Sequence, residues 1–180
     1  KLLFVAVGEQ GTILTSADGT TWTSVNSITH TYDNGTTVNL STNGVAYGNS
    51  TFVAVGSSGY IYTTTDLSNS WSPRNSGTSN YLRGVIYVNS TFVAIGDSGT
   101  ILTSSDNGST WTSRTSGISY DLNGVTYGNS TFVTVGFSTI STSLDGTTWT
   151  SRTSGTSNYL RGVIYVNSTF VATGDSGTIL

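Results

Sequence analysis

The sequence predicts an all-β protein built from tandem repeats of about 40 residues. Residues 84–102 and 162–180 have the same sequence except at Ile95 and Thr173, so one unit is used at least twice. Short runs rich in Val, Ile, Thr, Tyr and Phe alternate with Asn, Gly, Asp and Ser, which is typical of strands separated by turns. No apolar stripe with helical spacing occurs. We expect one domain over residues 1–180, with repeat units at 1–43, 44–83, 84–123, 124–161 and 162–180.

Each complete unit contains four predicted strands. In the third unit they are GVIYVN (84–89), STFVAIG (90–96), GTILTS (99–104) and STWTSR (109–114). An Asn-Ser pair joins the first two strands, and Asn tolerates the positive φ of a tight hairpin turn. The second strand is apolar on both faces, which predicts cover on both sides. Pro73, the only proline, falls in a fourth strand, so we expect that strand at the outer edge of its sheet.

Four-stranded units of about 40 residues, repeated in tandem, are typical of the blades of a β-propeller. The chain holds four first, five second, five third and four fourth strands, which is 18 of the 20 that five blades need. We therefore expect five blades, the first without its inner strand and the fifth without its outer strand, or a trimmed view of a longer protein. In an alternative, residues 162–167 supply the inner strand of the first blade and close a four-bladed ring. Residues 168–180 would then be a surplus strand pair able to join the sheet of another molecule.

The turn between the third and fourth strands carries a recurrent pattern. It reads SADGTTW at 16–22, SSDNGSTW at 104–111 and SLDGTTW at 143–149. This resembles the BNR/Asp-box motif, Ser/Thr-x-Asp-x-Gly-x-Thr-Trp, of β-propellers that include the sialidases. The second unit, TTDLSNSW at 64–71, lacks the Gly, so we expect a looser turn there.

The recurrent Asp and Trp of this motif are expected to be structural. The Asp carboxylate can accept backbone N–H bonds across the turn, and the Trp can anchor the blade. The alternative is a carboxylate site for a metal or a sugar. The structural residues are Asp18, Trp22, Asp66, Trp71, Asp106, Trp111, Asp145 and Trp149.

The resemblance to sialidases does not extend to catalytic residues. Sialidase activity implies an arginine cluster, a Tyr/Glu nucleophilic pair and a further acidic residue. Here Glu9 is the only glutamate and His30 the only histidine. No pair of carboxylates with acid/base logic is visible, and a Ser-His-Asp site would rest on His30 alone. We expect no catalytic residue, no cofactor and no metal.

Composition limits the partners. The net charge is −3 without a Lys/Arg cluster, which argues against nucleic acid. The chain has no cysteine, which excludes disulfides and thiolate metal sites. No apolar run approaches the ~18 residues of a membrane span, so we expect no membrane insertion. The uncharged Ser/Thr/Asn-rich surface fits a secreted or cell-surface protein.

The loops between blades are the first candidate binding feature. They read SNYLR at 79–83 and 157–161, and SYDLN at 119–123. Such loops gather on one face of a propeller, where Tyr could stack on sugar rings and polar groups could bond hydroxyls. The alternative is that Tyr and Leu pack between blades. The candidate ligand-binding residues are Asn80, Tyr81, Arg83, Tyr120, Asp121, Asn158, Tyr159 and Arg161.

The second candidate feature is an insertion at residues 25–43, which is nine residues longer than the matching segment 114–123. Alternating apolar residues around an Asp-Asn-Gly turn predict a β-hairpin that contacts a partner or subunit, or is a tolerated insertion. Together with the C-terminal segment it supplies the candidate subunit contacts. These are His30, Tyr32, Phe170, Val171, Ile179 and Leu180.

From these features we expect a non-catalytic extracellular β-propeller that acts as a structural or adhesive surface protein. Its incomplete terminal blades would let it assemble into filaments, because head-to-tail contacts that do not close give open polymers. The alternative is a lectin with repeated inter-blade sites. The expected partners are accordingly further copies of the chain, as a homo-oligomer or filament, or cell-surface glycans.

Overall fold

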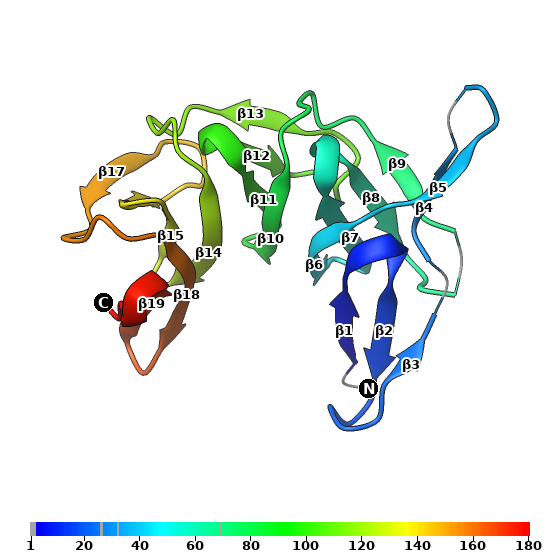
Figure 1. Ribbon diagram of the computed structural model, residues 1–180, viewed down its shortest axis with the longest axis horizontal. Coiled ribbons are helices and arrows are strands. Elements are labelled where there is room, and N and C mark those ends of the chain that lie inside the picture. The colour runs from blue at the N-terminus through cyan, green and yellow to red at the C-terminus, as the bar shows by residue number, and fades with distance from the viewer. Residues whose placement is uncertain (1–2, 26, 32, 69) are drawn as a thin grey trace.

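The computed structural model describes every residue except 1–2, 26, 32 and 69. Figure 1 shows a series of small sheets that follow one another along an open arc, with the two chain ends at opposite ends of the arc. Each sheet is antiparallel and keeps its strands in chain order, as blades of a propeller do.

Three of the blades are complete. Blade two contains β6 (Thr42–Gly48), β7 (Thr51–Gly56), β8 (Ile61–Thr64) and β9 (Ser72–Arg74). Blade three contains β10 (Leu82–Val88), β11 (Thr91–Gly96), β12 (Ile101–Ser104) and β13 (Thr112–Arg114). Blade four contains β14 (Leu122–Gly128), β15 (Thr131–Gly136), β16 (Thr139–Ser143) and β17 (Thr150–Thr153).

The blades at the ends of the arc are incomplete. Blade one contains β1 (Phe4–Val7), β2 (Ile13–Ser16) and β3 (Thr23–Ser24), and β1 corresponds to the second strand of the other blades. Blade five contains β18 (Leu160–Val166) and β19 (Thr169–Gly174), with an isolated bridge between Thr173 and Ile179 beside them. The prediction of five blades with two incomplete ones is therefore confirmed, but the predicted third strand of blade five is reduced to the bridge at Ile179.

The four-bladed alternative is wrong for this structure. β18 pairs with β19 over the full register from Leu160 opposite Gly174 to Val166 opposite Thr169, and it does not supply an inner strand to β1. Residues 168–180 are therefore part of the fifth blade and not a surplus pair. β18 pairs with β19 rather than with β1 because the two-residue turn Asn167-Ser168, with φ of 47° and 60°, joins β18 directly to β19.

Burial follows the predicted strand pattern. In β11, Phe92 and Ala94 belong to the core between blades two and three, whereas Val93 and Ile95 belong to the core between blades three and four. The second strand is therefore covered on both faces, as predicted. Pro73 lies in β9, the outermost strand of blade two, and an edge strand is where a residue without an N–H group is tolerated.

The inner strands approach one another closely around the arc. A Cβ added at Gly44 in β6 would lie 3.1 Å from Gly84 Cα in β10, and one at Gly124 in β14 would lie 3.1 Å from Gly162 Cα in β18. Glycine at the start of each inner strand is thus what lets neighbouring blades meet near the axis.

The predicted hairpin is confirmed as β4 (Thr29–Thr31) and β5 (Thr37–Asn39). Its base is fixed to blade one, since Ile28 N–H donates to Gly11 O at 3.1 Å and Ile28 is buried. Its tip extends away from the blades in Figure 1. The helical segments among the described residues are four single turns, η1 (Glu9–Gly11), η2 (Ser57–Gly59), η3 (Asp97–Gly99) and η4 (Asp175–Gly177). Within the part of the chain that is described, no helix has the length and apolar character to cross a membrane.

Candidate functional site

The turn between the third and fourth strands uses its carboxylate internally. Asp18 Oδ1 accepts the backbone N–H groups of Thr20 and Thr21, each at 2.8 Å, and the Ser16 hydroxyl at 3.0 Å. The Thr21 N–H, followed by that of Thr20, holds the pKa of Asp18 well below its usual value, because these bonds favour the ionised form. The carboxylate is therefore engaged within its own turn.

The other turns with the complete motif follow the same plan. Asp145 Oδ1 accepts the N–H groups of Thr147 and Thr148 at 2.8 Å, and these bonds, that of Thr148 first, depress its pKa strongly. The Thr110 hydroxyl, donating to Asp106 Oδ2 at 2.6 Å, is the largest cause that lowers the pKa of Asp106 to about 2. These aspartates are therefore ionised at neutral pH.

The tryptophans complete the turns with one exception. Three indole N–H groups donate to the carbonyl of the glycine in their own turn, at 3.0 to 3.2 Å; these are Trp22 to Gly19, Trp111 to Gly108 and Trp149 to Gly146. Trp71, in the turn that lacks the glycine, is buried, and its Nε1 has no partner among the described residues. In that turn the pKa of Asp66 is lowered mainly by the backbone N–H of Ser68.

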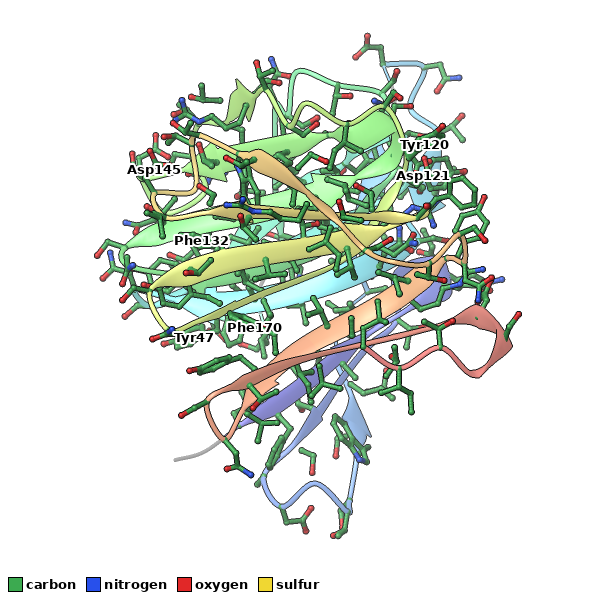
Figure 2. All side chains as sticks on the ribbon, turned by 90° about the vertical axis from the view of Figure 1, so that its left-hand side faces the viewer. Tyr47, Tyr120, Asp121, Phe132, Asp145 and Phe170 are labelled. Atoms are coloured by element: carbon green, nitrogen blue, oxygen red, sulfur yellow. The ribbon has the colours of Figure 1, made fainter. Side chains whose placement is uncertain are left out.

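The blade ends form two different faces. Figure 2 shows Tyr120 and Asp121 at one end of the blade strands, while Asp145 and Tyr47 lie at the opposite end. The first is the loop face, defined by the inter-blade loops at 79–83, 119–123 and 157–161. The second is the turn face, which carries the Asp and Trp turns just described.

The asparagines on the loop face fasten each loop to the blade that follows. Asn80 Nδ2 donates to Thr100 Oγ1 at 2.9 Å, and Asn158 Nδ2 donates to Thr178 Oγ1 at 2.8 Å. The predicted ligand amides are thus used to hold the chain in place.

The arginines and Asp121 on the loop face are paired. The Arg83 guanidinium bonds the Asp97 carboxylate through Nε and reaches Asp121 Oδ2 at 3.0 Å, which links blades three and four. Arg161 makes two parallel bonds of 2.8 Å to the carboxylate of Asp175, the bidentate arrangement that suits a guanidinium. These two arginines also line a hollow at the start of the inner strands, together with Asn43, Tyr81 and Asn123.

A row of aromatic rings crosses the loop face between blades four and five. The Tyr120 ring meets Phe137 edge-on with 5.2 Å between centroids, and Phe137 lies 4.6 Å from the Tyr159 ring. Arg161 Cζ lies 4.7 Å from the Tyr159 ring centroid. Tyr120 is 54% exposed and Tyr159 40% exposed, so the row presents ring surface to solvent.

Phe137 is the residue of this row that sequence reasoning missed. It occupies the position of Asp97 in blade three and Asp175 in blade five, as the segments IGDSGT, VGFSTI and TGDSGT show. The exchange of a carboxylate for a ring in one unit was the available signal. Tyr81, also exposed, lies apart from this row, at the hollow.

The predicted subunit contacts lie in different places. His30, half-buried, bonds Tyr62 OH through Nδ1 at 2.8 Å, so this side of the hairpin faces blade two; Tyr32 lies outside the described residues. Phe170 and Val171 are half-buried in β19, while Ile179 and Leu180 are exposed at the end of the arc. Among the residues that are described, no group of three His, Cys, Asp or Glu gathers to hold a metal.

The fold is that of a β-propeller with tandem repeats, as similar solved structures indicate. YCF48 bound to D1 peptide matches with a TM-score of 0.71 and 22% identity, over 97% of this chain and 60% of that chain. YCF48 from Cyanidioschyzon merolae matches with a TM-score of 0.68 and 16% identity, over 97% and 61%. The WD40 β-propeller domain of Doa1 matches with a TM-score of 0.73 and 12% identity, over 97% and 59%.

The chain therefore spans about three fifths of the length of these structures. No protein-family profile matches it, and no curated protein is similar at a significant level. At these identities the similarity defines the fold and leaves function to the site.

Proposed function

We propose that this chain is a non-catalytic structural propeller that joins further copies of itself through the blades at the two ends of its arc. The observation that carries the proposal is a contrast between equivalent residues. Phe4 of blade one is 41% exposed, whereas Phe92 at the same position of blade three is fully buried. At the other end, Ile179 is 73% exposed and Ile101 is fully buried.

The direction of these side chains matches end-to-end contact. Phe92 packs into the core shared with the preceding blade, so Phe4 faces the open side of blade one. Ile101 and Ile86 pack into the core shared with the following blade, so their equivalents Ile179 and Ile164 face the open side of blade five. The two open sides thus carry the two halves of an inter-blade core, which is the surface that one copy offers to the next.

Sedimentation velocity of surface variants tests this proposal. Phe4→Ser and Ile164→Ser should each shift assembled material toward the monomer, because each removes apolar surface from one open side. Leu144→Ser is the matched control, since Leu144 is 77% exposed but lies in a turn of blade four. Equal sedimentation of all three variants and the unmodified chain would contradict the proposal.

A second candidate function is carbohydrate binding at the loop face, and the exposed ring row favours it. Aromatic rings with neighbouring hydroxyl and guanidinium groups suit the apolar face and the hydroxyls of a sugar. One of the similar propellers, YCF48, is bound to a D1 peptide, which supports a ligand-binding use of the fold. Tyr159→Ala should abolish retention on a glycan array, while Tyr47→Ala, on the opposite face, should not.

The remaining expectations belong to the same proposal. We infer that the Asp and Trp turns are Asp-box turns in a structural role, which the internal bonds of Asp18, Asp106 and Asp145 support. Arg83 and Arg161 are already paired with aspartates, which supports a role for these arginines in holding the loop face together. A secreted or cell-surface location agrees with the cysteine-free, Ser/Thr/Asn-rich composition.

A further inference from the structure

Two kinds of inner strand alternate along the chain. Blades two and four have Asn before the first glycine of the inner strand and a second glycine at its end, whereas blades three and five have Arg and Val at these two positions. In blades two to five the residues are Asn43 and Gly48, Arg83 and Val88, Asn123 and Gly128, and Arg161 and Val166. The joints, meaning the contacts between neighbouring blades, therefore come in two kinds.

The joint between blades two and three is close. Asn43 Nδ2 donates to Leu82 O at 2.9 Å, so a side chain of one inner strand holds the backbone of the next. A Cβ added at Gly48 would overlap the Tyr87 ring, which shows that this ring lies directly against the glycine. The joint between blades four and five repeats both contacts, with Asn123, Leu160, Gly128 and Tyr165.

The middle joint, between blades three and four, is wider at the inner strands. Val88 replaces the glycine at the strand end, and a side chain there excludes a tyrosine ring from the place that it takes in the other two joints. The atoms nearest to a Cβ added at Gly84 are side-chain carbons of Ile95 and Val125, at 3.6 to 3.8 Å. In the other two joints the equivalent Cβ would lie 3.1 Å from backbone of the next blade.

Polar bonds across the middle joint are made by partly exposed groups. Arg83 reaches Asp121 Oδ2 at 3.0 Å, with 36% and 38% of the two side chains exposed. Asn89 Nδ2 donates to Tyr127 OH at 3.0 Å, and Ser98 N–H donates to Asp121 Oδ1 at 3.1 Å. Because water competes for such groups, these bonds contribute little to holding the two blades together.

The apolar core of the middle joint also contains two hydroxyl groups. Thr134 and Ser141 lie opposite each other in β15 and β16 and are fully buried, and neither side-chain oxygen has a hydrogen-bond partner among the described residues. They lie on the face of Phe132, which packs against blade three, and they replace the Ala94 and Leu102 of that blade. A buried hydroxyl without a partner disfavours burial, so this core is weaker than the one between blades two and three.

We propose that the middle joint is a hinge between two bodies that follow one another along the arc, blades two and three and blades four and five (Figure 1). The hinge does not depend on end-to-end assembly. The hollow on the loop face lies across it. The lining residues are Asn43, Tyr81 and Arg83 from the first body, and Asn123 and Arg161 from the second. Rotation at the hinge therefore widens or narrows this hollow, as in proteins that close two bodies around a ligand.

Distance distributions between pairs of spin labels test the hinge, because the chain has no cysteine of its own. Ser72, Thr112 and Thr150 are exposed and occupy the same position in β9, β13 and β17. Thr112→Cys with Thr150→Cys spans the middle joint, and Ser72→Cys with Thr112→Cys is the matched control across the joint between blades two and three. Dilution of the labelled protein with unlabelled chain confines the measurement to distances within one molecule.

The hinge predicts a broader distance distribution, or one with two maxima, for the 112/150 pair than for the 72/112 pair. Arg83→Asn with Val88→Gly gives blade three the residues of blades two and four, and it should narrow the 112/150 distribution to the width of the control. Equal widths for the two pairs in the otherwise unmodified chain would overturn the hinge, whether or not that variant folds. A variant with unchanged circular dichroism and an unchanged broad distribution would overturn the assignment of the hinge to the inner strands.

Discussion

Phe4 and Phe92 occupy the same repeat position in blades one and three, and truncating each to alanine measures how far the open side of blade one is exposed. Phe92→Ala removes a ring that is fully buried and packs at a tilt against Tyr87, with 4.6 Å between the ring centroids. Such a change costs about 3–5 kcal/mol, because the lost transfer free energy adds to the cavity that remains. Phe4→Ala removes a ring that is 41% exposed at the open side of blade one.

The cost at Phe4 follows from its exposure. Full burial of a phenylalanine is worth about 1.5–3 kcal/mol, and roughly three fifths of this ring is covered, so the transfer loss is about 1–2 kcal/mol. The cavity contribution is small because the site opens to solvent. We therefore expect Phe4→Ala to cost about 2–3 kcal/mol less than Phe92→Ala in free energy of unfolding.

Urea titration monitored by tryptophan fluorescence and circular dichroism gives both costs as shifts of the midpoint at an unchanged slope. The experiment is done at a protein concentration at which light scattering gives the monomer mass. A cost at Phe4 equal to that at Phe92 would refute the reasoning, because it would mean that another blade covers Phe4 and that the arc is closed.

Three further predictions concern the turns and the inner strands. The folded-state pKa of Asp106 lies below the ordinary value of about 3.9, so its contribution to stability is present above pH ~4 and is lost as pH falls toward 2; Asp106→Asn should flatten the acid limb of stability against pH. Trp149→Phe should lose about 0.5–1.5 kcal/mol more than Trp71→Phe in thermal unfolding, since only the Trp149 N–H has an acceptor; equal losses would argue against that bond. Asn123 Nδ2 donates to Leu160 O across blades four and five at 2.9 Å, so Asn123→Ala should raise amide exchange in β18 and leave β10 unchanged.

The repeat itself made the fold predictable. Strand identity follows from units such as STFVAIG, which is apolar on both faces, and from the Pro73 that only an edge strand admits. The inner strands begin two residues before the predicted unit starts, at Thr42, Leu82, Leu122 and Leu160. A bulge separates each of these residues from the glycine that opens the predicted unit, and the strand pairing continues across it.

The site was less predictable because it depends on contacts between units. The sequence aligns Tyr120 with the other loop tyrosines only loosely, and it does not indicate that Phe137 links Tyr120 to Tyr159. It likewise does not indicate that Arg83 reaches an aspartate of the next loop, Asp121.

The central claim is that the arc stays open within one chain and is extended by further copies. Multi-angle light scattering on the unmodified chain, over a hundredfold range of concentration, tests it most directly. The account predicts a mass that rises from 18.8 kDa through successive multiples as the concentration increases. A single mass of 18.8 kDa across the whole range would contradict it, because the two open sides would then be covered within the molecule or would have no affinity for each other.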